Sequence, residues 1–269
     1  MIVMFAKPVS LKPYYELYKE QPRLAMRQVN DIVRGEIERM MLNIGDLDNY
    51  KEIDFLRTTS FGDLFASAQG YDPKVLTQKL TSDKNLVAAL GAAAIDSPDE
   101  LKDIYAMAKE LRKGVKKLGV DESMVATKAS TTKLIGRCLI DLLGLPVALF
   151  AAGPTLLVFL VPWLLNSFLV KDKQFRGSIN LASLLLVTYP LCGIVPVIVM
   201  LCGGHLFSAL GYLLLFPLMV IFEWDYGKHV FNTARYARAC SAEGGSKLKA
   251  LRALRKEMFE RLGALLSVK

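Results

Sequence analysis

The sequence predicts a mainly α-helical protein, in which a charged helical part is followed by a helical membrane region. Two stretches, residues 142–170 and 177–222, contain no Asp, Glu, Lys or Arg, and uncharged apolar runs of this length are typical of membrane helices. The hydrophobic fraction of 52% and the mean hydropathy of +0.31 are high for a soluble globular protein. Outside these runs, apolar residues recur at helical spacing, and one short strand is expected near the start.

The expected strand is the first element. Residues 2–6 form an apolar run that Lys7 and Pro8 end, which is typical of a buried strand leading into a loop. No second strand is evident after residue 10. A lone strand leaves its backbone N–H and C=O groups without partners. Either this run is not a strand, or its partner strands lie outside the chain.

Helices are expected from Pro22 onward. Apolar side chains between residues 26 and 44 recur at helical spacing with charges between them, and Gly45 is the expected end of this helix. Several short helices follow between residues 46 and 120. Ser97 and Pro98 mark the start of the last of them, as cap and first helical residue. Its buried face would consist of Leu101, Ile104, Tyr105, Ala108 and Leu111.

The uncharged run 177–222 predicts two membrane spans. One span needs about 20 apolar residues, so the run holds two, at about 181–201 and 206–222. Residues 202–205, Cys-Gly-Gly-His, form the turn between them. After the second span, residues 223–226, Glu-Trp-Asp-Tyr, combine aromatic and acidic side chains, as is typical of a membrane interface.

The run 142–170 allows two arrangements. It is long enough for one span, but three prolines interrupt it, and each leg of a hairpin turning at its middle is too short for a bilayer core of about 30 Å. Three spans would put the basic loop 171–176 on the face opposite to Arg137. A re-entrant hairpin followed by two spans puts every basic segment on one face, which the positive-inside rule favours. We therefore expect a multi-pass membrane protein with its basic segments, including residues 171–176, on the cytoplasmic face.

An amphipathic helix is expected at residues 246–265. Its apolar stripe consists of Leu248, Leu251, Leu254, Met258, Leu262 and Leu265, and basic residues dominate the rest. A basic amphipathic helix beside a membrane span most often lies in the interface on anionic lipid. The alternative is that the stripe docks on the protein's own soluble part.

The net charge of +8 bears on the partners. In a membrane protein, such an excess marks the cytoplasmic side and contact with anionic lipid, so the phospholipid bilayer is the expected partner. Nucleic acid is not expected, because the chain has no recognisable nucleic-acid-binding module and no basic patch with interleaved aromatic residues.

No residue pattern indicates a catalytic, cofactor or metal site. His229 could pair with Asp225 on a helix, and Asp141 with Arg137, and both pairs are expected to be structural. His205 has no carboxylate near it in sequence. No phosphate-binding Gly-rich loop and no Gly-x-Ser-x-Gly motif is present. The four cysteines, Cys138, Cys192, Cys202 and Cys240, form no Cys-x-x-Cys pair and are expected to be reduced.

Five segments, in order along the chain, carry a resemblance to a known family. They are residues 5–10 (Phe-Ala-Lys-Pro-Val-Ser), 18–23 (Tyr-Lys-Glu-Gln-Pro-Arg), 40–44 (Met-Met-Leu-Asn-Ile), 144–146 (Gly-Leu-Pro) and 170–178 (Val-Lys-Asp-Lys-Gln-Phe-Arg-Gly-Ser). They resemble the C-terminal portion of bacterial lysophospholipid acyltransferases of the PlsC type, which acylate 1-acyl-glycerol-3-phosphate or related acceptors. The resemblance runs through most of the chain, although Ala6 stands where the family pattern has Gly.

The resemblance implies a membrane-anchoring part of a glycerophospholipid acyltransferase, with acyl-CoA or acyl-carrier protein and a lysophospholipid as partners. The catalytic signature of the family is a His followed, after four residues, by an Asp that orients it. Here Leu210 and Ala234 stand at that distance from His205 and His229. We therefore expect the catalytic dyad to be missing from this chain and the chain to be inactive alone.

The expected organisation has four parts: a remnant of the acyltransferase α/β domain at 1–45, a helical soluble segment at 46–132, the membrane region at 133–225 and the basic amphipathic tail at 226–269. A free-standing membrane interaction or scaffold protein is the alternative function, because it would need neither partner strands nor a catalytic half. A transporter component is disfavoured, because substrate pathways usually need polar residues at membrane depth.

Overall fold

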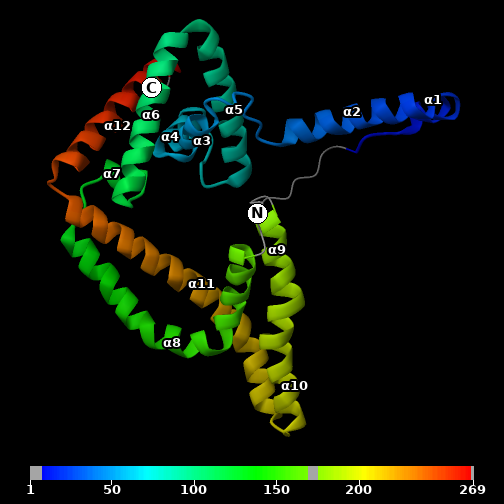
Figure 1. The fold of residues 1–269 in the computed structure, drawn as a ribbon, viewed down its shortest axis with the longest axis vertical. Helices are drawn as coiled ribbons and strands as arrows, with labels where there is room; N and C mark the ends of the chain where they lie inside the picture. The colour runs from blue at the N-terminus through cyan, green and yellow to red at the C-terminus, as the bar shows by residue number, and fades with distance from the viewer. Residues whose placement is uncertain (1–7, 169–174, 268–269) are drawn as a thin grey trace. The chain divides into compact units, whose positions relative to one another are not determined.

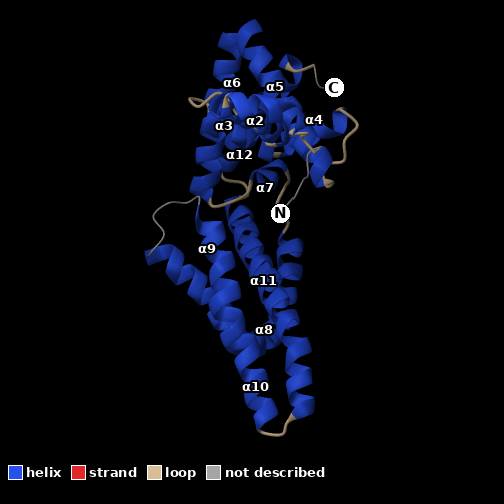
Figure 2. Ribbon diagram, turned by 90° about the vertical axis from the view of Figure 1, so that its right-hand side faces the viewer, coloured by secondary structure: helices blue, strands red, loops and turns tan. Residues whose placement is uncertain are grey.

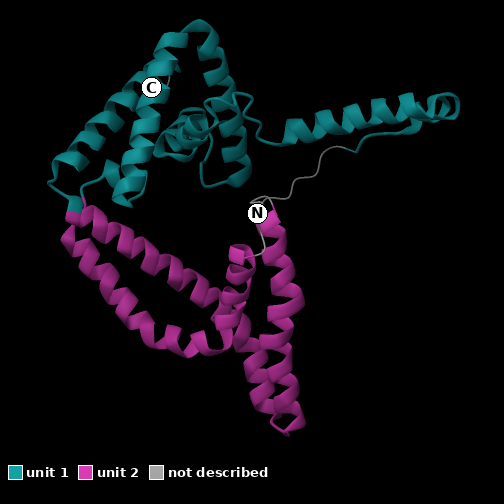
Figure 3. Ribbon diagram, in the orientation of Figure 1, with its two compact units in different colours: residues 1–128, 242–269 teal, residues 129–241 magenta. Residues whose placement is uncertain are grey.

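The computed structural model describes residues 8–168 and 175–267, and every regular element within these ranges is helical (Figures 1 and 2). The mainly α-helical prediction is confirmed. The strand expected at residues 2–6 lies outside the described residues. The chain forms two compact units (Figure 3): Met1–Lys128 together with Ala242–Lys269, and Ala129–Ser241. We call them unit 1 and unit 2.

Unit 1 contains the shorter helices of the N-terminal half and the last helix of the chain. These are η1 (Lys12–Tyr14), α1 (Tyr15–Glu20), α2 (Pro22–Met40), α3 (Tyr50–Thr58), α4 (Ser60–Ala68), α5 (Leu76–Asp96), α6 (Pro98–Leu118), α7 (Glu122–Ala126) and α12 (Ser246–Leu265). Helix α2 begins at Pro22, where the fixed φ of proline suits the first helical position. It ends at Met40, before the expected end at Gly45.

Helix α6 supplies the central face of the unit 1 core. Its predicted apolar stripe is buried as a whole, with Ile104, Ala108 and Leu111 fully inaccessible to solvent. Pro98 is its first residue, but the Ser97 side chain makes no capping hydrogen bond, so that part of the prediction is wrong. Gly119 follows the last turn with φ of 65°, a left-handed conformation that glycine adopts without steric cost.

Helix α12 packs on the rest of unit 1 through its apolar stripe. Leu248, Met258 and Leu262 are almost inaccessible to solvent, and Gly114 of α6 lets Leu251 approach so closely that an added Cβ would overlap its side chain. The expectation that this stripe lies on lipid is therefore wrong. The stripe is not available to a bilayer, because burial against α6 already removes it from water.

The described residues of unit 2 form three long helical rods. They are α8 (Thr131–Phe168), the continuous series α9 (Arg176–Ser183), η3 (Leu184–Thr188), η4 (Pro190–Ile194) and α10 (Val195–Cys202), and α11 (Leu206–Ala242). All three are long and apolar enough to cross a membrane. The spans expected at 181–201 and 206–222 fall inside the second and third rods. Between these rods, Gly204 has φ of 78°, which a tight turn requires.

Helix α11 continues beyond the expected span end at residue 222 and reaches Ala242. Gly227 lies inside the helix without interrupting it, and the helix ends before Gly244 and Gly245, of which Gly244 has φ of 86°. Residues 226–242 therefore belong to the long helix of unit 2 rather than to the C-terminal tail.

Helix α8 is continuous from Thr131 to Phe168, with Pro146, Pro154 and Pro162 inside it. The expected break into two legs at Gly153 and Pro154 is therefore absent. Instead the helix bends and turns back, so that both of its ends lie toward the end of unit 2 where α9 begins, away from the turn between α10 and α11 (Figure 1). Proline removes one backbone hydrogen bond and kinks a helix, so the hairpin course is achieved by bending a single helix.

The rods of unit 2 meet around a small apolar cluster. Val158 of α8, Cys192 of η4 and Phe216 of α11 are buried together, with Leu184 and Val220 beside them. The Tyr212 hydroxyl donates a hydrogen bond of 2.6 Å to the Cys192 carbonyl. An ordinary α-helical partner for that carbonyl would be the N–H four residues on, but Pro196 stands there and has none. Tyr212 therefore bonds a carbonyl whose usual α-helical donor is missing.

Candidate functional site

A cavity of about 570 Å³ opens between the three rods of unit 2. Its walls come from one face of α8, from α9 with the start of η3, and from the middle of α11. The lining residues are Val158, Phe159, Pro162, Trp163, Asn166, Asn180, Leu184, Val220, Ile221 and Trp224. Small-molecule sites in proteins commonly have volumes of about 300–1,000 Å³ and predominantly apolar walls, and this cavity has both properties.

The cavity is apolar at one end and polar at the other. Its floor is formed by Val158, Leu184 and Val220, which pack around the buried cluster of unit 2. At the opposite end, the Asn166 amide donates a hydrogen bond to the Asn180 side-chain oxygen and joins α8 to α9. Asn166 lies two helical turns after Val158 on α8, and Asn180 lies one turn before Leu184 on α9. Both amides are therefore displaced from the floor toward the same end of the cavity.

Tryptophan and lysine complete the polar end, which we call the rim. Trp163 and Trp224 are the two tryptophans of the chain, and tryptophan prefers the level of lipid headgroups. The Phe159 ring stacks on Trp224, with centroids 6.3 Å apart. The Lys228 ammonium lies 4.7 Å from the centroid of the Trp224 ring, which is within the range of a cation–π contact. Lys228 also lies 3.6 Å from the Asp225 carboxylate.

A second polar feature joins the first half of α8 to the second half of α11. The His229 Nδ1 atom lies 2.7 Å from Asp141 Oδ1, and the Tyr226 hydroxyl donates to the Asp141 carbonyl at 2.8 Å. Gly144 makes room for the Tyr226 ring, because an added Cβ would lie 2.7 Å from Tyr226 Cε2. We call this set of contacts the polar seam.

The polar seam replaces both pairs that the sequence suggested. His229 pairs with Asp141 rather than with Asp225, which instead lies beside Lys228. Arg137 does not pair with Asp141; its guanidinium lies over the Tyr236 ring, 4.9 Å from the centroid. Helical spacing identified neighbours within α8 and within α11, but His229, Asp141 and Arg137 have their partners on the other helix.

The geometry of the seam is that of a helix–helix contact. A carboxylate that orients an imidazole is also an element of general-base catalysis. Here the Tyr226 hydroxyl is bonded to a backbone carbonyl, and Tyr236 accepts a hydrogen bond of 2.8 Å from the Ser130 N–H. Both tyrosines therefore help to hold α8 against α11. The same structural role is expected of Asp141 and His229.

The remaining candidates are His205 and the four cysteines. His205 is exposed in the turn before α11, and its backbone N–H bonds the Met200 carbonyl at 2.9 Å. Among the described residues, no three His, Cys, Asp or Glu side chains are grouped closely enough to hold a metal ion. The four cysteines are free thiols. No catalytic, cofactor or metal residue is thus assigned in the described parts of the chain.

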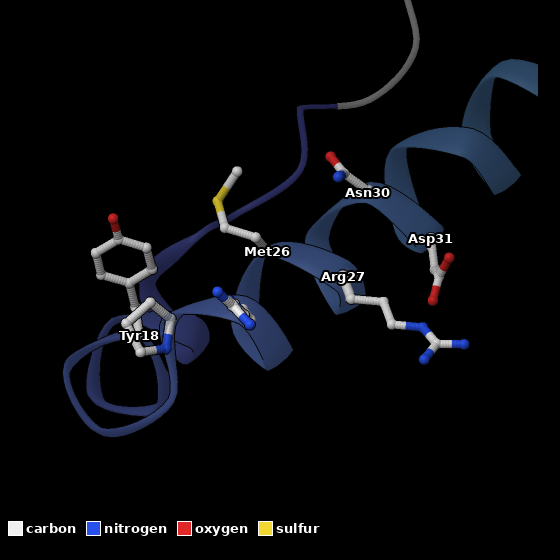
Figure 4. Close-up of a pocket in the computed structure, with 7 residues that line it drawn as sticks. Tyr18, Met26, Arg27, Asn30 and Asp31 are labelled. Carbon is white, nitrogen blue, oxygen red and sulfur yellow. The ribbon is translucent and has the colours of Figure 1, made fainter.

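Unit 1 carries a shallow depression between α1 and α2 (Figure 4). Tyr18 and Met26 border it on one side, while Arg27 and Asp31 extend away from them. Tyr18 and Met26 are each about half exposed, at 52% and 51%. The depression is therefore a surface feature of two exposed helices.

Sequence reasoning missed the cavity because its residues come from three separate segments. A usable signal was nevertheless present, since Asn166 and Asn180 are amides within or beside uncharged runs, where polar side chains are expensive unless they are paired. Compared with known proteins, the chain matches no protein-family model, no curated protein and no solved structure.

Proposed function

We propose that this chain is the membrane-anchoring part of a glycerophospholipid acyltransferase and that it transfers no acyl group by itself. The observation that carries the proposal is the pairing, in unit 2, of three apolar rods with a cavity that is apolar at one end and polar at the other. Such a unit suits a protein whose reactants are lipids. The family is suggested by the five resembling segments, including residues 144–146 in α8.

In this role unit 2 holds the protein in the bilayer that supplies a lysophospholipid acceptor and receives its diacyl product. The acyl donor, acyl-CoA or acyl-carrier protein, follows from the family resemblance. The N-terminal residues 1–45 are proposed as the end of an acyltransferase α/β domain, whose described part here comprises η1, α1 and α2.

The proposed topology is multi-pass, with the basic segments on the cytoplasmic face. Both ends of α8, the start of α9 and the end of α11 lie toward one end of unit 2 (Figure 1). Basic residues occur at that end, among them Lys133, Arg137, Arg176 and Arg238, whereas the turn between α10 and α11 carries none. The positive-inside rule places the basic end in the cytoplasm, with α8 as a re-entrant helix.

The proposed lack of activity rests on the histidines. In the family, a His and an Asp that follows it after four intervening residues act together on the acceptor hydroxyl. Here His229 is held by Asp141 from another helix, and His205 lies in an exposed turn. Neither has the order and spacing of the family block.

The test is acyl transfer by the purified 269-residue chain in phospholipid vesicles. With 1-acyl-glycerol-3-phosphate as acceptor, and acyl-CoA or acyl-carrier protein as donor, we expect no ester above the background of empty vesicles. Diacyl product formed in proportion to the amount of chain would contradict the proposed inactivity. A nucleotide sequence that encodes a His-x-x-x-x-Asp block, in frame and upstream of Met1, would support the family assignment, whereas its absence would favour the alternative below.

The alternative is a free-standing membrane interaction protein. It is favoured by helix α2, on which Met26, Val33 and Ile37 are 51%, 41% and 45% exposed along one face. An apolar face of this kind on a surface helix suits a protein partner. Capture of a defined partner by the wild-type chain, lost on changing Val33 and Ile37 to Ser, would support this alternative.

A further inference from the structure

We infer that the cavity of unit 2 binds one acyl chain of an anionic diacyl phospholipid from the surrounding bilayer, with the lipid phosphate at the rim. The inference rests on the membrane insertion of unit 2 that is part of the proposed function. It concerns a resident lipid of the membrane and does not depend on acyl transfer.

The first argument is the match in polarity. A phospholipid is apolar along its chains and polar at its headgroup, and it lies with its long axis across one leaflet. The cavity has the same order, from the floor of Val158, Leu184 and Val220 to the rim with its Asn166–Asn180 pair. An empty apolar cavity facing hydrocarbon would forfeit the contacts of its walls, and a lipid chain restores them.

The second argument is the position of the rim along the rods. Asn166 lies near the end of α8 at Phe168, and Asn180 lies one turn after Arg176, the first residue of α9. On α11, the charged residues begin immediately after Phe222. All three rods therefore change from apolar to polar at the rim. Trp163 and Trp224 are at this level, where their rings suit the headgroup region.

The third argument is charge. The Lys228 ammonium rests on the Trp224 ring that lines the cavity. An ammonium has three donors, and its partner Asp225 is 3.6 Å away with both side chains more than half exposed. Arg176 is exposed, one turn from Asn180 on the same face of α9. The rim also carries two acidic residues, Glu223 and Asp225, so the preference for an anionic headgroup rests on Arg176, on the free donors of Lys228 and on the amide pair, which suit a lipid phosphate.

Trp163 and Trp224 provide a direct probe, because both tryptophans of the chain line the cavity. The full chain is reconstituted in vesicles in which brominated phosphatidylglycerol or brominated phosphatidylcholine is titrated against unlabelled phosphatidylcholine. Bromine quenches tryptophan fluorescence only at short range. We expect the phosphatidylglycerol to associate more tightly, so that half-maximal quenching occurs at a lower mole fraction.

Two variants test the rim and the floor separately. Lys228→Gln should lower the preference for phosphatidylglycerol over phosphatidylcholine about fivefold, the effect expected of one basic residue near an anionic headgroup. Lys133→Gln, which makes the same charge change in the first turn of α8, should leave this preference unchanged.

Leu184→Phe should fill the floor of the cavity and reduce quenching by both lipids. Leu186→Phe, at a position that is 77% exposed, is its matched control.

Three results would overturn the inference. They are equal association of the two lipids with the wild-type chain, an equal loss of preference in Lys228→Gln and Lys133→Gln, and equal quenching in Leu184→Phe and Leu186→Phe. Failure of the chain to float with vesicles in a density gradient would overturn membrane insertion, and with it both this inference and the proposed function. A chain that floats but shows no lipid preference contradicts the inference alone.

Discussion

At the scale of single residues, close packing and burial decide which substitutions unit 1 tolerates. Gly62 of α4 lies against the backbone carbonyl of Arg57, and an added Cβ would overlap that oxygen. Gly91 of α5 has no neighbouring atom within 4 Å of such a Cβ. Tyr105 of α6 is a buried phenol that is only 7% exposed. The first two positions differ in steric room, and the third couples stability to pH.

We expect Gly62→Ala and Gly91→Ala to change stability in opposite directions. Gly62→Ala should lower the free energy of unfolding of unit 1 by about 1–3 kcal/mol, because the backbone of Arg57 cannot move aside without strain. Gly91→Ala should raise it by about 0.5–1 kcal/mol, because alanine loses less conformational entropy inside a helix. Hydrogen exchange of the α3–α6 amides in the full chain measures both. Equal effects of the two changes would contradict the steric explanation.

Tyr105 should make unit 1 less stable in alkali. Burial, with a smaller effect of the Asp46 charge, raises the pKa of Tyr105 to about 12 from an ordinary value of 10.0. The folded state thus holds the phenol proton more tightly than the unfolded state does. The stabilisation that comes from this difference is complete below pH 10.0 and is lost as the pH rises toward about 12. Unfolding measured across this window should be less pH-dependent in Tyr105→Phe than in the wild type. Identical pH dependence would show that other groups control it.

At the scale of elements, helix α12 shows how side-chain contacts redirect a basic amphipathic helix. Two of its basic residues make contacts within unit 1: Arg255 pairs with Glu122 of α7, and Arg252 donates to the Val125 carbonyl at 3.0 Å and to Glu243 at 2.6 Å. The hydrogen bonds to Glu243 raise the pKa of the Arg252 guanidinium further above its ordinary value. The helix is therefore fixed by its apolar stripe and by two arginines together.

Truncation of a buried side chain in the α12 stripe should lower the free energy of unfolding of unit 1. Met258 is fully buried, and Met258→Ala should cost about 2–5 kcal/mol through lost burial and the cavity left behind. Lys256, whose side chain is 79% exposed, is the control, and Lys256→Ala should change stability by less than about 0.5 kcal/mol. The measurement is exchange protection of the α6 and α12 amides. Protection that survives Met258→Ala would contradict the docking of α12 as a stabilising contact.

At the scale of the whole molecule, the native cysteines distinguish the re-entrant topology from three spans. Cys138 lies in the first half of α8, Cys202 ends α10, and Cys240 lies near the end of α11. With a re-entrant α8, Cys138 and Cys240 face the same side of the membrane and Cys202 faces the other. With three spans, Cys138 and Cys202 share a side and Cys240 is opposite.

The topology prediction is therefore a labelling pattern. Three variants are made, each retaining one of these cysteines, and intact cells are treated with a membrane-impermeant thiol reagent. We expect reaction only at Cys202, which is exposed beside the turn before α11. Labelling after membrane permeabilisation confirms that Cys138 is reactive. Protection of both Cys138 and Cys202 together with labelling of Cys240 in intact cells would establish three spans instead.

The sequence by itself determined the helical class, the apolar rods, the turn at Gly203 and Gly204 and the buried face of α6. Each of these depends on composition or on spacing within one segment, where a helix imposes its own period. Asp141 and Arg137 show the limit, because helical spacing allowed their pairing but could not reveal that His229 of another helix lies closer.

Only the tertiary structure decided the contacts between segments: the bend of α8 as one helix, the docking of α12 on α6, the polar seam and the cavity with its rim. Their residues are distant in sequence, and the energy of each contact depends on which helix faces which. Spacing showed that residues 246–265 have an apolar stripe, but a stripe fits a bilayer and a protein core equally well. The packing of Leu251 against Gly114 settled that choice, because most of the stripe, namely Leu248, Leu251, Met258 and Leu262, is buried within unit 1.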